Sequence, residues 1–287
     1  MVHPVGTYAT QTIADGLAFP EGPVVLPDGS VAVVQMAADL VTVISPDGRR
    51  RDLHCAGGPN GMALEATGDH VIVCLNGGLS FTHEKSGALM PGVAQDAAAR
   101  GGLLRMSLVT GEVEILVEPG PTSPVSGPND LVLSSARSPA GVGVWFTDLG
   151  RRLPDSIEPG GIIWRGEGGE LVRAAYPRHG RPNGIALSGD EATLYVTESL
   201  SAQVWAWPVL GPGRLGPPRL VRRLDPPARL DGMAVTTAGT LVVATLVVGA
   251  LTAMDTQGRV LASVEVDDPM PTNLAFGGAD RRDLYVT

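Results

Sequence analysis

The sequence predicts an all-β protein, a six-bladed β-propeller in which residues 1–287 form a single domain. Three observations lead to this prediction. The chain contains 38 Gly and 24 Pro among its 287 residues, and both residue types are costly inside helices. Hydrophobic residues nevertheless make up 44% of the chain, which is unlike a disordered protein. The third observation is an internal repeat made of short apolar runs separated by turns.

Each copy of the repeat begins with a polar residue, often followed by Gly, and continues through an apolar run, a turn and a second apolar run. Two examples are NGMALEATGDHVIVC and NGIALSGDEATLYVTES. The six copies begin at Glu21, Asn60, Asn129, Asn183, Asp231 and Asn273. A period of about 40 to 50 residues with β-type runs is typical of propeller blades rather than of helical solenoids.

The residues after each copy fit a third and a fourth strand. In the first copy these are residues 41–45 and 50–53, joined by a Pro46-Asp47-Gly48 turn in which Gly accepts a positive φ. The equivalent segments of the later copies are 103–108 with 112–117, 162–165 with 170–174, 203–208 with 219–224, and 250–254 with 259–266. The sixth copy reaches only its second strand, and residues 8–14 are a candidate for one of the missing strands.

The longest interval between copies contains an insertion, residues 79–100. Glycine pairs flank it, Gly77-Gly78 before and Gly101-Gly102 after, and such pairs are suitable hinges. Long loops on a rigid scaffold often determine specificity. We therefore expect a lid over the channel, with a solvated surface loop as the alternative.

Composition excludes several classes of protein. A net charge of −9, from 21 basic and 30 acidic residues, is unfavourable for a nucleic-acid binder. No apolar run approaches the roughly 18 residues of a membrane helix, and the N-terminal residues do not resemble a signal peptide. Two Cys are too few for a disulfide framework. We expect a cytoplasmic protein that acts on a small molecule, and the oligomeric state stays open.

The first residues of the six copies are the candidate functional site. Each begins the innermost strand of its blade at one mouth of the channel, so the repeat should bring all six together. They comprise two carboxylates, Glu21 and Asp231, and four amides. Oxygen-only donors suit one divalent cation, Ca²⁺ first, then Mg²⁺ or Mn²⁺, with Zn²⁺ bound weakly. A role in capping turns would explain the Asn residues but not Glu21, because Glu is a poor turn residue. It would also not explain why two carboxylates are brought close together without a cation to offset their repulsion.

Several segments, among them FPEGPVV, RPNGIALSGDEATLYVTES, LDGMAV and TNLAFGGADRRDLYVT, resemble the senescence-marker-protein/regucalcin/gluconolactonase (SMP-30/gluconolactonase-like) family from about residue 17 to residue 287. The resemblance implies a propeller with one divalent cation at the channel mouth, and many members hydrolyse sugar lactones. It implies Glu21, Asn183 and Asp231 as cation ligands and Asp231 as the catalytic base. Asn129 matches an asparagine that contacts substrate in some members and the cation in related phosphotriesterases.

Two departures from the family pattern bear on the substrate. The FTD sequence of the third copy continues as Leu149-Gly150-Arg151-Arg152, where bacterial lactonases usually have a Pro-x-Tyr-Gly segment. Gly127 stands where the mammalian branch has arginine. The cation ligands are thus retained while the usual groups that recognise a sugar are replaced.

The resemblance and the ring together predict a metal-dependent lactone or ester hydrolase of the gluconolactonase type. The cation would polarise the carbonyl group and Asp231 would take the proton of the attacking water. The predicted substrate-binding residues are Asn60, Asn129, His179 and Asn273. Two alternatives remain: a phosphotriesterase-like hydrolase on the same metal site, and a non-catalytic binding propeller with a structural cation.

Overall fold

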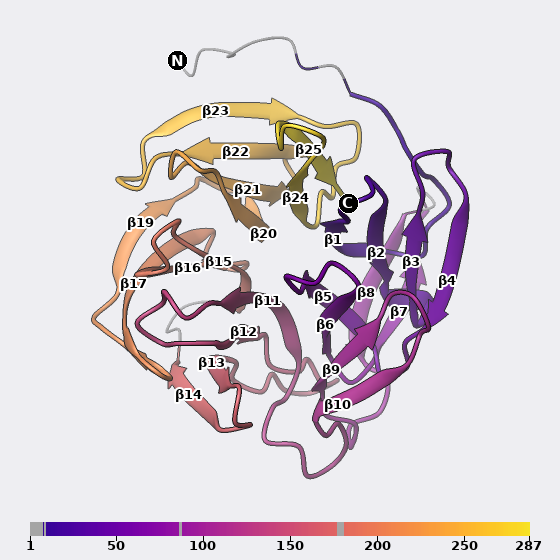
Figure 1. Cartoon of the computed structure of the whole chain (residues 1–287), viewed down its shortest axis with the longest axis horizontal. Coiled ribbons are helices and arrows are strands. Elements are labelled where there is room, and N and C mark those ends of the chain that lie inside the picture. Colours follow the sequence, from indigo (N-terminus) through magenta and orange to yellow (C-terminus); the bar gives the residue numbers. More distant parts are fainter. Residues whose placement is uncertain (1–7, 9, 86–87, 177–180) are drawn as a thin grey trace.

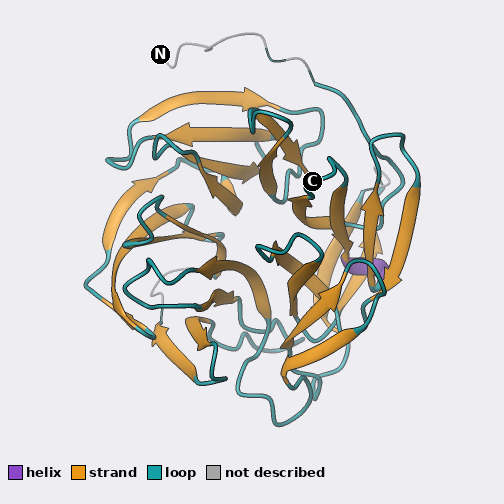
Figure 2. Cartoon of the chain, viewed as in Figure 1, coloured by secondary structure: helices purple, strands orange, loops and turns teal. Residues whose placement is uncertain are grey.

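The computed structural model describes residues 8, 10–85, 88–176 and 181–287. Antiparallel sheets are arranged in a ring around a central axis (Figure 1). Within the described ranges the helical structure is limited to a single three-residue 3₁₀ element, η1 (Met36–Ala38), and strands account for nearly all other regular structure (Figure 2). The prediction of an all-β propeller is therefore confirmed, and no described helix is long and apolar enough to span a bilayer.

The first two sheets come from the first two copies of the repeat. Blade 1 contains β1 (Pro20–Val25), β2 (Val31–Gln35), β3 (Leu40–Ile44) and β4 (Arg50–His54). Blade 2 contains β5 (Pro59–Leu64), β6 (His70–Leu75), β9 (Gly102–Ser107) and β10 (Val113–Val117). Between β6 and β9, a separate two-stranded sheet is formed by β7 (Leu79–His83) and β8 (Leu89–Ala94).

The next three sheets repeat the same antiparallel order. Blade 3 contains β11 (Pro128–Ser134), β12 (Gly143–Asp148), β13 (Gly161–Gly166) and β14 (Leu171–Ala175). Blade 4 contains β15 (Pro182–Leu187), β16 (Thr193–Glu198), β17 (Gln203–Gly211) and β19 (Arg219–Arg223), with the short β18 (Arg214–Leu215) also paired to β17. Blade 5 contains β20 (Arg229–Val235), β21 (Leu241–Leu246), β22 (Ala250–Met254) and β23 (Val260–Glu265).

The described residues form five blades, not the six that the sequence analysis predicted. The remaining sector holds a two-stranded sheet of β24 (Leu274–Gly277) and β25 (Asp283–Val286). The sixth copy supplies residues for two strands only, and the described residues before β1 form no strand. Instead of completing the sheet, Ala14 and Leu17 pack with Tyr285 against apolar side chains of blade 1.

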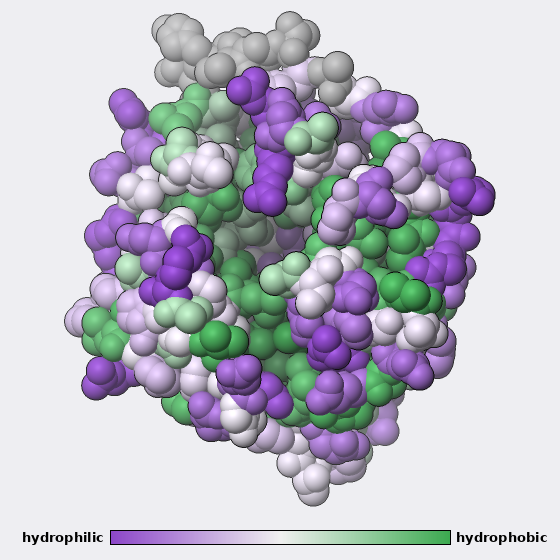
Figure 3. Space-filling model, viewed as in Figure 1, coloured by the Kyte–Doolittle hydropathy of each residue, from purple (hydrophilic) through white to green (hydrophobic). Residues whose placement is uncertain are grey.

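The first strand of every repeat lies closest to the axis. β1, β5, β11, β15, β20 and β24 each contact the next in this order, and β24 contacts β1, so the six strands close a ring. At the closure, the Thr272 hydroxyl donates a hydrogen bond to the Pro20 carbonyl at 2.9 Å. Figure 3, viewed down this axis, shows a hollow at the centre of the ring.

Glycines allow the inner strands to approach one another. A Cβ atom built on Gly61 would lie 2.7 Å from the Asn129 carbonyl oxygen, and one built on Gly184 would lie 2.5 Å from that of Asp231. Such distances are too short for a carbon atom, so only glycine fits there. This explains why a polar residue followed by Gly recurs along the chain.

Apolar side chains pack between neighbouring blades. The cluster between blades 1 and 2 includes Val34, Val41, Val71, Val73 and Met106, all of which are buried. Similar clusters join blades 3 and 4 and blades 4 and 5. Because strand residues alternate between the two faces of a sheet, each apolar run covers both neighbours of its blade. This packing fixes the inner strands around the axis.

The insertion is a hairpin attached to the blades on both sides of it. The Phe81 ring lies 5.5 Å from the Phe19 ring, centroid to centroid, and Leu79 also packs against the core of blades 1 and 2. On the other side, the Ala94 N–H donates to the Arg152 carbonyl at 2.8 Å. These contacts attach the hairpin to the blades on both sides, and its role as a lid stays a prediction.

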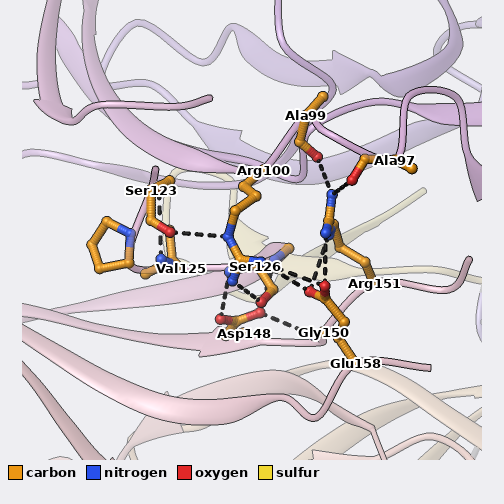
Figure 4. A network of polar contacts seen from close by, with 12 residues as sticks. Ala97, Ala99, Arg100, Ser123, Val125, Ser126, Asp148, Gly150, Arg151 and Glu158 are labelled. Carbon is orange, nitrogen blue, oxygen red and sulfur yellow. Dashed lines mark hydrogen bonds and ion pairs between the residues drawn. The ribbon is translucent and has the colours of Figure 1, made fainter. Parts of the chain in front are cut away.

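A polar network secures the end of the insertion to the loop after β12 (Figure 4). The Arg151 guanidinium donates to the carbonyls of Ala97 and Ala99, each at 2.7 Å, and pairs with Glu158 at 2.7 Å. Arg100 also pairs with Glu158, at 3.2 Å. The insertion therefore lies on the same face as the residues that follow β12.

Candidate functional site

The six predicted ring residues lie at the start of the six inner strands, and all are buried: Glu21, Asn60, Asn129, Asn183, Asp231 and Asn273. In each of the five blades the pairing between the first two strands is interrupted at this point. In β1 the interruption falls between Glu21 and Val24. A β-bulge releases backbone groups from the ladder and redirects a side chain. The bulges thus position the ring residues.

One group of contacts joins the two ends of the ring. The Asn273 side-chain amide donates to Glu21 Oε2 at 3.1 Å, and it also hydrogen-bonds the Asp130 carboxylate. The Gly22 N–H donates to Glu21 Oε2 at 2.8 Å. Glu21 and Asn273 are 252 residues apart in the sequence, so the closed ring alone brings them together.

A second group of contacts positions Asp231. The Asn183 amide hydrogen-bonds the Asp231 carboxylate and donates to the Ser199 hydroxyl at 3.0 Å. The Thr197 hydroxyl donates to the Asp231 carbonyl at 2.7 Å. Thr147, at the same place in the preceding blade, donates in the same way to the Asn183 carbonyl. The Thr of each FTD or VTE sequence therefore holds the ring residue of the next blade.

Two ring residues present amides that no described residue engages. The side chains of Asn60 and Asn129 make no hydrogen bond within the described part of the chain. Unlike the fully enclosed polar atoms that lack a partner, the side-chain amides of Asn60 and Asn129 are therefore not completely shut off from the channel. Their amides are therefore available to a ligand in the channel. His179, the remaining predicted residue, lies outside the described residues.

Asp130 is a functional candidate that the sequence analysis missed. It is buried beside Asn129 and follows it at the position that Gly occupies in four of the other copies. Its carboxylate accepts hydrogen bonds from the Leu131 and Ile185 N–H groups as well as from Asn273. The sequence did contain a signal for this residue: a charged side chain stands where four other copies have Gly.

Three buried carboxylates thus share the site. Burial raises the pKa of Glu21 to about 8, and the negative charge of Asp130 adds to this. Burial, followed by the charges of Glu21 and Asp130, raises the pKa of Asp231 well above its usual range. Burial raises the pKa of Asp130 to about 7. No Arg, Lys or His in the described ranges forms an ion pair with any of the three.

The donor chemistry fits a divalent cation that prefers oxygen. The described residues contain no group of three or more His, Cys, Asp or Glu side chains placed to hold a metal. The ring offers a different set: its buried carboxylates are close enough to affect one another's pKa values, and the side-chain amides of Asn183 and Asn273 hydrogen-bond them. Calcium accepts such ligands readily, and a positive ion would compensate carboxylates that no basic side chain neutralises.

Taken together, these features define a β-propeller with an oxygen-lined polar site at one mouth of its central channel. Residues 19–287 match the model of the SMP-30/gluconolactonase/LRE-like region. The chain belongs to this family, as its motifs predicted.

Similarity to individual proteins is more distant. The chain is 28% identical over 149 residues to a 6-deoxy-6-sulfogluconolactonase of Pseudomonas putida, an alignment that covers 46% of this chain and 51% of that protein. It is 30% identical over 130 residues to a pentonolactonase of Haloferax volcanii, which covers 45% of each chain. The aligned segments thus span about half the length of these relatives.

Solved structures show the same fold. A calcium-binding protein, regucalcin, from Agrobacterium tumefaciens superposes with a TM-score of 0.75 at 19% identity, over 98% of this chain and 85% of that one. At this level of identity the similarity extends to the fold alone.

Proposed function

We propose that this protein is a lactonase that opens a lactone or a related ester with the help of one divalent cation, Ca²⁺ in the first place. The observation that carries the proposal is the set of buried carboxylates, Glu21, Asp130 and Asp231, without a basic partner in the described part of the chain. Membership of the family and similarity to two lactonases support the reaction.

Four ring residues would hold the cation: Glu21, Asn129, Asn183 and Asp231. When bound, the cation would supply positive charge that polarises the carbonyl oxygen of the substrate. The free amides of Asn60 and Asn129 would orient the substrate in the channel, and Asn273 would keep the Glu21 carboxylate in place through its 3.1 Å hydrogen bond.

Asp231 would act as the general base that accepts a proton from the attacking water. A carboxylate whose pKa lies above its usual range is a stronger base than an exposed one. The hydrogen bond from Asn183 and the Thr197 bond to the Asp231 carbonyl would fix the direction in which the carboxylate accepts the proton.

Hydrolysis of a panel of lactones before and after removal of divalent cations tests the proposal. We expect turnover to disappear with a chelator and to return with Ca²⁺, Mg²⁺, Mn²⁺ or Zn²⁺. Asp231→Asn should lower kcat by about a hundredfold or more. The matched control is Asp255→Asn in the same blade, a half-buried turn carboxylate paired to Arg259 at 3.1 Å, which should leave kcat unchanged. Full activity of Asp231→Asn would refute the role of this residue.

The same assays with phosphotriesters test the second enzymatic possibility. Absence of turnover on both substrate classes, together with retained cation binding, would instead favour a binding propeller.

A further inference from the structure

A pocket lies where blade 4 meets blade 5, its neighbour in the ring (Figure 1). Its volume is about 370 Å³, which is within the range of sites for small molecules. Residues of three adjacent strands of blade 4 and of one turn of blade 5 line it, among them Tyr195, Ala206, Pro208, Pro217, Arg219 and Thr256.

The pocket is at the end of blade 4 that is remote from the six ring residues. β15 begins beside Asn183 of the ring and ends at Leu187, and β16 then runs back toward the ring from Thr193. Thr193 pairs with Pro208, which forms part of the pocket wall. The pocket is therefore separate from the site at the channel mouth.

The register of the strands creates the space. Tyr195 of β16 pairs with Ala206 of β17, and Ala206 pairs with Arg219 of β19. Residues that pair directly project from the same face of a sheet. Because neighbouring strands are about 4.8 Å apart, the Cα atoms of Tyr195 and Arg219 are roughly 10 Å apart. The small Ala206 side chain between them leaves room for a ligand.

The turn between β22 and β23 of blade 5 closes one side of the pocket. Arg219 Nη2 donates to the Thr256 carbonyl in this turn at 2.8 Å. A Cβ atom built on Gly258, in the same turn, would collide with the Val221 carbonyl oxygen of β19. The turn thus packs directly against the strand that carries Arg219, and both blades fix the walls.

The Tyr195 hydroxyl is a hydrogen-bond donor that the protein does not use. Tyr195 is only 5% exposed, and its hydroxyl has no partner among the described residues. It is not one of the fully enclosed polar atoms that lack a partner, so it is reached through the pocket that Tyr195 lines. Burial raises the pKa of Tyr195, so the hydroxyl keeps its proton and can donate it to a ligand.

The Arg219 guanidinium supplies further donors. Apart from the Nη2 bond to Thr256, its N–H groups have no partner among the described residues. Asp190 is close enough for its charge to act on Tyr195, but its carboxylate accepts hydrogen bonds from the Ser188 hydroxyl and the Ala192 N–H within its own turn. Within the described ranges Arg219 forms no ion pair.

We propose that this pocket binds a small carboxylate with a flat apolar body, such as an aromatic acid. The carboxylate oxygens accept hydrogen bonds from the Tyr195 hydroxyl and the Arg219 guanidinium, a fork that matches carboxylate geometry. The apolar body packs between Pro208 and Pro217 over the Ala206 methyl group. The site does not depend on the reaction proposed for the channel mouth.

Benzoate and its neutral analogue benzamide test the pocket. Each is titrated into the full chain and followed by the NMR signals of the backbone amides. We expect benzoate to bind with a Kd on the order of 1 mM and about tenfold more tightly than benzamide, because hydrogen bonds to a charged acceptor are stronger. The signals that shift should be those of β17, β19 and Thr256. Equal affinities, or no binding of benzoate at about ten times that concentration, would overturn the proposal.

Variants assign the binding to the two donors. Tyr195→Phe removes the hydroxyl and keeps the buried ring, so the fold should be retained while the Kd of benzoate rises about fivefold. Arg219→Gln should remove the preference of benzoate over benzamide. The controls are Tyr285→Phe, in the equivalent LYVT sequence of the sixth copy, and Arg223→Gln, an exposed residue of β19 that does not line the pocket. Unchanged binding in both pocket variants would contradict the assignment.

A titration with Ca²⁺ and another with a chelator separate this pocket from the channel mouth. The Kd of benzoate should be the same in both, because the pocket lies away from the ring. If benzoate binds only with Ca²⁺ and shifts the signals of Glu21 and Asp231, the carboxylate binds at the ring and the pocket proposal fails. Absence of lactone hydrolysis would leave the benzoate result unaffected.

Discussion

At the scale of single residues, the site depends on positions where a side chain does or does not fit. Gly61 leaves room for the backbone of Asn129 and for the Asp130 carboxylate, whose Oδ1 would lie 2.5 Å from a Cβ at position 61. The two residues of the repeated polar-Gly pair therefore have different roles. The first residue faces the site, and the second allows the next inner strand to come close.

Gly61→Ala should destabilise the protein because its Cβ would collide with backbone atoms that cannot move away. We expect a loss of about 1–3 kcal/mol in the free energy of unfolding, measured by urea denaturation. Gly189→Ala is the matched control, since nothing lies within 4 Å of a Cβ at that position and φ is not positive. The control should be neutral or slightly stabilising. Equal stability of the two variants would contradict the tight packing of the inner strands.

The Glu21 carboxyl should make the cation-free protein less stable as pH rises. Its pKa is raised from 4.5 to about 8 in the folded state, so between these values the folded protein holds a proton that the unfolded chain lacks. Stability is then present below about pH 4.5 and is lost progressively up to about pH 8. The free energy of unfolding lost between these two pH values is on the order of a few kcal/mol.

Glu21→Gln should remove much of this pH dependence. In the presence of a chelator, we expect the variant to be more stable than the original protein at pH 8 and similar to it at pH 5, by thermal melting. Glu265→Gln, on an exposed part of β23, is the control and should keep the original slope. If the stability of Glu21→Gln changed with pH as much as that of the original protein, burial of the Glu21 carboxyl would not be the cause of the pH dependence.

At the scale of elements, the sequence was sufficient where periodicity and turns agree. The third and fourth strands of the first copy, predicted at 41–45 and 50–53, are found as β3 (Leu40–Ile44) and β4 (Arg50–His54), because a Pro-Asp-Gly turn between two runs allows few alternatives. The insertion was harder to predict. Its flanking glycines suggested hinges, whereas the contacts of Phe81 and Arg151 that fix it are made with residues far away in the sequence.

Because the hairpin packs on its neighbours, Phe81→Ala should lower stability. Phe81 is half-buried against Phe19, so we expect a loss of about 1–2 kcal/mol in the free energy of unfolding, seen as a lower Tm. Lys85→Ala at the exposed tip of the same hairpin is the control and should have no effect. A loop that is free in solution would instead tolerate both changes equally.

At the scale of the whole molecule, the sequence predicted the ring but not its count of blades. The six inner strands do close around the axis, yet among the described residues five of them carry a sheet of four or more strands, whereas β24 pairs with β25 alone. Ring closure could be inferred from the repeat. The charge balance inside the ring could not, because it depends on Asp130 and on the bonds of Asn273, which join distant blades.

A cation at the mouth would connect blades 1, 3, 4 and 5, so it should stabilise the whole ring rather than one blade. At a concentration one hundred times its Kd, Ca²⁺ should add about 2.7 kcal/mol to the free energy of unfolding, which raises Tm by several degrees in a single transition. The gain should shrink from pH 8 to pH 5, because the cation must displace protons from Glu21 and Asp231, whose pKa values are raised. Differential scanning calorimetry with and without a chelator measures both effects. A gain that is equal at pH 8 and pH 5, or absent for Ca²⁺, Mg²⁺, Mn²⁺ and Zn²⁺ alike, would mean that these two carboxylates do not hold a cation.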